Sequence, residues 1–225
     1  MRKFPSLFMV IFIFLLSACA RNVPFPDNAT GNTSTQYIEN KGSDTIVNLA
    51  LAWSERYHQE HPNVMISVTG GGTGTGITAL INGTVDIANA SRQIKPEELD
   101  AARKAGYDPQ EFIIARDAIA VVVNPFNPVD HLTLQQLSMI FKGEITNWNQ
   151  VGGPDMEIVC LSRETNSGTH LYFLESVIRQ GKPNDKSIFS ADILLLPSSE
   201  GIIAEVKDNP HAIGYDSLGY ITPEV

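Results

Sequence analysis

Apolar residues recur at helical spacing in several segments of the chain, and short β-rich runs lie between them. The first predicted helix spans residues 46–61 and is followed by Pro62, which cannot continue it. Its apolar residues share one face: Ile46, Leu49, Ala50, Trp53 and Tyr57. Further helices are predicted over residues 76–81, 96–105, 133–141 and 169–178, and strands over residues 64–69, 85–88, 118–124 and 157–161. This alternation is typical of an α/β protein with mixed sheets.

The N-terminal residues have the pattern of a bacterial lipoprotein signal peptide. Arg2 and Lys3 precede an apolar run over residues 7–16 that is too short to span a bilayer as a mature helix. The run ends in LSAC at residues 16–19, which resembles the lipobox at which such proteins are cleaved and acylated. We expect residues 1–19 to be a signal peptide and Cys19 to carry acyl chains such as palmitate. The mature chain would then be anchored on the extracytoplasmic side of the cell membrane; the alternative is an ordinary signal peptide in which the cysteine is incidental.

Composition limits the possible partners and cofactors. Residues 20–36 are rich in Asn, Thr, Pro, Ser and Gly and are predicted to form a flexible tether, with order beginning near Tyr37. The formal net charge of −9 argues against nucleic acid or an anionic membrane surface as partner. Cys160 has no second thiol or histidine at ligand spacing, so we interpret it as a core residue. We expect neither a metal nor a cofactor.

Three loops of Gly, Ser and Thr run directly into predicted helices: residues 42–45 (GSDT), 72–76 (GTGTG) and 166–169 (NSGT). A helix start offers unpaired N–H groups and Ser or Thr adds a neutral hydroxyl donor, so such loops are able to bind an anion. Ordinary helix capping explains each loop taken alone, but three together could surround a tetrahedral oxyanion. Arg163 stands four residues before Ser167 and would add a two-pronged guanidinium donor. The alternative for Arg163 is a surface salt bridge to Glu164 or Asp155.

Six segments resemble, in order, the signature blocks of the phosphate-binding lipoproteins of ABC importers. They are GSDT, GGGTGTGI, VDIANASR, IFKGEITNW, SRETNSGT and AIGYDSLGY, and the match covers residues 37–222. The resemblance implies the α/β fold of type II periplasmic binding proteins, with two lobes (residues 37–116 and 117–225), a hinge, and the ligand in the cleft between them. It also implies a receptor without enzymatic activity that captures inorganic phosphate. Such a receptor delivers phosphate to the membrane permease and ATPase subunits of an ABC transporter.

Carried over by position, the family's phosphate contacts fall on nine residues: Ser43, Asp44, Thr45, Thr73, Ser91, Arg163, Ser167, Gly168 and Thr169. Some family members have an aspartate in the place of Ser91 that accepts the proton of the bound phosphate. Here we expect Asp44 to take that role, because a carboxylate accepts a hydrogen bond from protonated phosphate and repels sulfate. A simple helix N-cap is the alternative for Asp44. The sequence leaves open whether Arg92 pairs with the ligand or with a neighbouring carboxylate.

Other functional classes fit the motifs less well. The glycine-rich loop lacks the Gly-Lys-Ser/Thr of nucleotide-binding enzymes, and there is no Gly-x-Ser-x-Gly elbow of a serine hydrolase. A receptor for sulfate or molybdate and a phosphate-sensing protein without a transport role remain open. The resemblance also implies a C-terminal return to the first lobe after the AIGYDSLGY block. We therefore expect a truncated or split family member whose first lobe has apolar surface that is exposed, or covered by a partner or the tether.

Overall fold

The computed structural model describes residues 34–223 and residue 225. The expected signal peptide, Cys19 and most of the expected tether lie outside the described residues. Strand β1 begins at Gln36, the last residue of that tether. Within the described part of the chain, no helix has the length and apolar character needed to cross a membrane.

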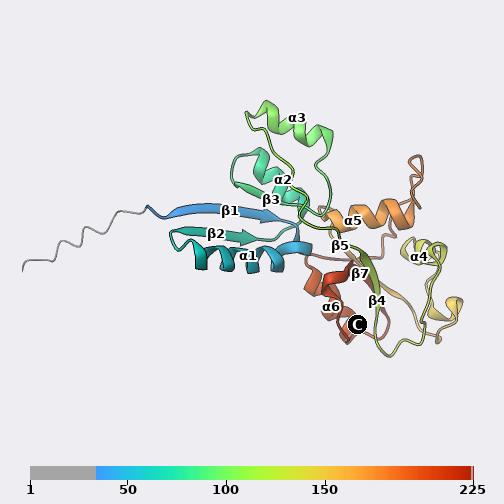
Figure 1. The fold of residues 1–225 in the computed structure, drawn as a ribbon. Coiled ribbons are helices and arrows are strands. Elements are labelled where there is room, and N and C mark those ends of the chain that lie inside the picture. The colour runs from blue at the N-terminus through green and yellow to red at the C-terminus, as the bar shows by residue number, and fades with distance from the viewer. Residues whose placement is uncertain (1–33, 224) are drawn as a thin grey trace, which may run out of the picture. The chain divides into compact units, whose positions relative to one another are not determined.

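The first sheet is parallel and has the strand order β2-β1-β3. Its strands are β1 (Gln36–Gly42), β2 (Val64–Thr69) and β3 (Ile87–Asn89). The helices of this part are α1 (Val47–Glu60), preceded by the 3-10 turn η1 (Asp44–Ile46), then α2 (Thr73–Ile81) and α3 (Pro96–Lys104). Parallel neighbours need such helical crossovers, so the carboxyl ends of all three strands meet at one edge of the sheet. We call the elements from β1 to α3 the first lobe (Figure 1).

The second sheet is mixed and has the order β4-β7-β5-β6, with β4 antiparallel to β7. Its strands are β4 (Ile119–Val123), β5 (Val159–Arg163), β6 (Leu194–Leu196) and β7 (Ala212–Ser217). The helices are α4 (Leu134–Phe141), α5 (Gly168–Phe173), which continues as the π-helix η3 (Leu174–Ile178), and α6 (Ser199–Asp208). The 3-10 turns are η2 (Trp148–Val151) and η4 (Leu218–Tyr220). We call the elements from β4 to η4 the second lobe.

Aromatic side chains form the centre of the second lobe. The rings of Phe173 and Tyr215 stack with their centroids 3.7 Å apart, and Phe141 packs edge-on against both. Trp148 is fully buried and donates its indole N–H to the carbonyl of His211 at 3.1 Å. Because Tyr215 belongs to β7, this packing fixes the strand whose next residue is Asp216.

The apolar face of α1 is largely exposed. Leu49, Trp53 and Tyr57 are 39%, 49% and 44% exposed, and Ala50 is the residue of this helix that is buried. These side chains line a groove of about 1220 Å³ together with residues of α2, β3 and the segment 107–119. In the described part of the chain, the first lobe thus presents an apolar groove to its surroundings.

Candidate functional site

The structure brings the nine predicted site residues to the carboxyl ends of the strands. Residues 43–45 follow β1, Thr73 begins α2 after β2, and Ser91 follows β3. In the second lobe, Arg163 is the last residue of β5, and residues 167–169 form the start of α5. Open α/β sheets bind ligands at this end of their strands. The two lobes face one another here: Thr45 contacts Thr169, and Asp44 contacts Arg163. Gly168 of the second lobe lies close to Ser91 and Thr73 of the first.

Five hydroxyl side chains lie at the junction of the lobes. Ser43 Oγ donates to Ser91 Oγ at 3.0 Å, and Ser91 Oγ lies 3.2 Å from Thr73 Oγ1. The backbone N–H of Ser91 donates to the same Thr73 oxygen at 3.1 Å. Across the junction, Thr45 Oγ1 and Thr169 Oγ1 are 2.8 Å apart. Hydroxyls donate and accept without carrying charge, so this group provides neutral donors that can turn toward an anion.

Gly168 lets the start of α5 approach these five hydroxyl side chains closely. A Cβ atom at Gly168 would lie 2.6 Å from Ser91 Oγ and 2.9 Å from Thr73 Oγ1. Any other residue would require Ser91 and Thr73, or the start of α5, to shift at this point. Ser167 has a local role as well, because its Oγ accepts the backbone N–H of His170 at 3.4 Å as the N-cap of α5.

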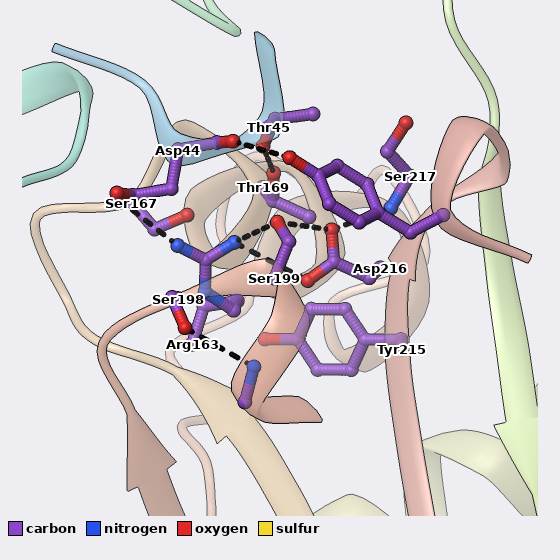
Figure 2. Close-up of polar contacts among 12 residues, drawn as sticks. Asp44, Thr45, Arg163, Ser167, Thr169, Ser198, Ser199, Tyr215, Asp216 and Ser217 are labelled. Carbon is purple, nitrogen blue, oxygen red and sulfur yellow. Dashed lines mark hydrogen bonds and ion pairs between the residues drawn. The ribbon is translucent and has the colours of Figure 1, made fainter. Parts of the chain in front are cut away.

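Arg163 is the charged centre of the site, and its side chain is only 1% exposed (Figure 2). Its Nη1 donates to Ser199 Oγ at 2.8 Å and to Asp216 Oδ2 at 3.2 Å. Its Nη2 donates to Asp44 Oδ2 at 3.2 Å and to the carbonyl of Pro197 at 2.9 Å. The buried Nε has no partner among the described residues. A buried N–H of a charged group without an acceptor is costly, and an anion at this position would satisfy it.

The alternative of a surface salt bridge for Arg163 is wrong, because the residue is buried and its partners are neither Glu164 nor Asp155. The N-cap alternative for Asp44 is also wrong. Asp44 Oδ1 accepts the backbone N–H of Gly71 at 3.1 Å, and neither η1 nor α1 has a side-chain cap. Asp44 therefore connects the loop at Gly71 in the first lobe to the guanidinium of Arg163 in the second lobe.

Asp216 and Ser199 belong to the site and were missed from the sequence. Asp216 is fully buried, and its Oδ1 accepts the Ser199 hydroxyl at 2.8 Å and the Ser217 N–H at 2.7 Å. Burial raises the pKa of Asp216, and the charge of Arg163 opposes that rise. The signal in the sequence is an acidic residue in the otherwise apolar run 212–216, because a buried charge requires a partner. With both carboxylates ionised, the guanidinium holds one positive charge between two negative ones.

Other reactive side chains do not take part in the site. Arg92 makes a two-pronged ion pair with Glu98, with N···O distances of 2.8 and 2.7 Å, and this hydrogen bonding lowers the pKa of Glu98. Arg92 thus pairs with a neighbouring carboxylate. Burial raises the pKa of the Cys160 thiol to about 12, as a core position requires. Among the described residues, no group of three His, Cys, Asp or Glu side chains could hold a metal ion.

Known proteins resemble the chain over most of its described length. The family model of the PBP superfamily domain matches residues 27–224. The phosphate-binding protein PstS of Pseudomonas aeruginosa is 32% identical over 201 residues, which cover 84% of this chain and 60% of that protein. Protein SphX of Synechococcus elongatus is 37% identical over 162 residues, covering 69% of this chain and 48% of that protein. The chain therefore spans about half to three fifths of the length of these relatives.

Solved structures agree with the family model. A crystal structure from Clostridium perfringens, ascribed to a phosphate ABC transporter substrate-binding protein with bound phosphate, is 33% identical with a TM-score of 0.74. The alignment covers 84% of this chain and 73% of that one. An ABC-type phosphate transport receptor from Vibrio cholerae is 33% identical with a TM-score of 0.59, covering 84% of this chain and 74% of that one. The fold and family expected from the sequence are confirmed: the chain belongs to the PBP superfamily and, within it, to the family of these phosphate-transport receptors.

Proposed function

We propose that this chain binds inorganic phosphate at the junction of its two lobes and delivers it to an ABC transporter for import. The observation that carries the proposal is the buried Arg163, whose Nε has no partner among the described residues and whose Nη2 contacts Asp44 of the first lobe. Next to Asp44 in the chain, the hydroxyl of Thr45 meets that of Thr169 across the junction. Such a combination of one guanidinium and neutral donors suits a small tetrahedral oxyanion. The relatives described above are phosphate-binding proteins and receptors, which supports the choice of phosphate.

In the proposed complex, Arg163 supplies the charged hydrogen bonds, and the hydroxyls of Ser43, Thr73 and Ser91 turn from one another toward the ligand. Thr45 and Thr169 add a donor from each lobe, and Ser167 and Gly168 present the start of α5. Asp44 accepts the proton of the bound phosphate. This last role follows from its position, because it is the acidic residue that touches both Arg163 and the glycine-rich loop.

The same proposal places the protein outside the cytoplasm. Residues 1–19 would direct export, Cys19 would carry the lipid anchor, and residues 20–36 would tether the lobes to the membrane. The lobes, residues 37–116 and 117–225, would move relative to one another about the segment near residue 116. The partners would be the permease and ATPase subunits of the transporter, and the receptor itself would catalyse no reaction.

Direct calorimetric titration with phosphate, arsenate and sulfate tests the function. We expect phosphate and arsenate to bind with similar affinity, because both are protonated tetrahedral anions at neutral pH, and sulfate to bind at least about tenfold more weakly. Preferred binding of sulfate would identify a receptor for a fully deprotonated oxyanion. Binding of none of the three would contradict the proposal.

Replacing Asp44 with asparagine is expected to lower the discrimination between phosphate and sulfate. The amide removes the charge that repels sulfate and weakens the acceptor for the phosphate proton, an interaction that contributes roughly 1.5–3 kcal/mol. The ratio of the sulfate to the phosphate dissociation constant should therefore fall by about tenfold or more in the same titration. The matched control is Asp192→Asn, which makes the same change in charge at an exposed position and should leave the ratio unchanged. An unaltered ratio in Asp44→Asn would show that another group accepts the proton.

A further inference from the structure

Asn166 connects the two lobes beside the proposed phosphate site. It lies in the turn between β5 and α5, and its Nδ2 donates to the carbonyl of Gly71 at 3.0 Å and to Thr75 Oγ1 at 3.2 Å. Its own carbonyl accepts the backbone N–H of Gly74 at 2.9 Å. One residue of the second lobe thus makes three hydrogen bonds to the glycine-rich loop of the first.

Two glycines of that loop leave the space that Asn166 occupies. Gly72 has φ +86°, a conformation that residues with a side chain rarely adopt, and a Cβ there would lie 2.8 Å from Asn166 Oδ1. A Cβ at Gly74 would lie 3.3 Å from the Asn166 carbonyl oxygen. The glycines at these two positions are therefore explained by the approach of the other lobe. Neither requires direct contact between its backbone and an anion.

The loop that receives Asn166 also carries a predicted phosphate contact. Thr73 lies between the two glycines that Asn166 approaches, and its hydroxyl faces Gly168, two residues after Asn166. Within the described part of the chain, the side chain of Asn166 has no hydrogen bond to Arg163 or to the five hydroxyls of the site. It therefore acts on the site through the backbone of residues 71–75, by fixing where that loop meets the start of α5.

We propose that Asn166 is a positioning residue that holds the lobes closed around bound phosphate and sets the rate of phosphate release. This inference rests on the proposed function. Release from a site between lobes requires the lobes to separate, and separation breaks the bonds of Asn166 to the first lobe. Capture begins from separated lobes, in which these bonds are absent. Asn166 accordingly slows dissociation and has little effect on association.

The test compares Asn166→Ala with the wild-type full chain. Labelled phosphate is bound, its release into excess unlabelled phosphate gives the dissociation rate constant, and equilibrium titration gives the dissociation constant. We expect release to be about tenfold faster, as the loss of two side-chain hydrogen bonds between the lobes implies, with the association rate constant changed by less than about twofold. Asn184→Ala, at an exposed position of the second lobe, is the matched control and should behave as the wild type.

Thr75→Val provides a milder second variant, because it removes one of the two acceptors of Asn166 and keeps the shape of the side chain. It should accelerate release by about threefold, and it keeps the test informative if Asn166→Ala folds poorly. Release at the wild-type rate in both variants overturns the positioning role. It is also overturned if the association rate constant falls by as large a factor as the dissociation rate constant rises. If the wild type itself binds no phosphate, the proposed function fails and this inference fails with it.

Discussion

Phosphate binding is expected to fall below detection when Arg163 is replaced by alanine. The guanidinium is the positive charge at the junction of the lobes, and without it the site presents two carboxylates, Asp44 and Asp216, to an anion. Repulsion then adds to the lost hydrogen bonds. Calorimetric titration with phosphate measures the effect, and circular dichroism establishes that the variant is folded.

Two further variants separate the contributions of charge, geometry and neutral donors to phosphate binding. Arg163→Lys keeps the charge but cannot reproduce the two-pronged geometry, so we expect a folded protein with strongly weakened binding. Thr73→Ala removes a single neutral donor and should weaken phosphate binding by roughly 1.5–3 kcal/mol, the range for a hydrogen bond to a charged group. Wild-type affinity in Arg163→Ala would show that the anion binds elsewhere.

Replacing Asp216 with alanine is expected to lower the free energy of unfolding by about 3–5 kcal/mol. The side chain is fully buried, and its removal leaves Arg163 Nη1, the Ser199 hydroxyl and the Ser217 N–H without their shared acceptor. Urea-induced unfolding, followed by circular dichroism, measures the difference.

Ser199→Ala is the control for this prediction, because it removes one neutral hydrogen-bonding group and leaves the ion pair in place. It should cost roughly 0.5–1.5 kcal/mol. Equal effects of the two substitutions would mean that the charge of Asp216 contributes nothing beyond one hydrogen bond, and that Asp44 alone neutralises Arg163.

The amphipathic and apolar segments of the fold were predictable from the sequence. The predicted strand 64–69 coincides with β2, and the predicted helix 96–105 differs from α3 by one residue. Strand β1 was missed because its sequence QYIENKG has few apolar residues. Its side chains are mostly exposed at the start of the strand, and buried positions occur only near its carboxyl end, next to the site. Strand β7 was recognised only as a signature block, because Gly214 and Asp216 interrupt its apolar pattern. The predicted helix 169–178 is an α-helix only to Phe173 and a π-helix beyond it.

The predicted site residues were the ones that lie in recognisable loops. Their motifs place most of them at helix starts, and Ser91 and Arg163 at strand ends. The arrangement of the strands then brings them together. The partners of Arg163 could not be found in this way, since Asp216 is 53 residues away and Asp44 is 119 residues away in the chain. Local patterns do not show which of 25 acidic residues meet a given arginine. The same holds for Asn166, whose partners belong to the other lobe.

The position of β7 in the second sheet has a consequence for the order in which the protein can assemble. The first sheet is built from strands that follow one another closely, between residues 36 and 89. In the second sheet, β7 lies between β4 and β5, yet it follows both in the sequence: β4 ends at Val123, well before β7 begins at Ala212. Until β7 emerges, β4 and β5 have unpaired edges, and contacts of such long sequence separation form slowly. The first sheet can therefore form while the second lobe is still being synthesised, whereas the second sheet, and with it the pairing of Arg163 with Asp216, has to wait until residues 212–217 are available.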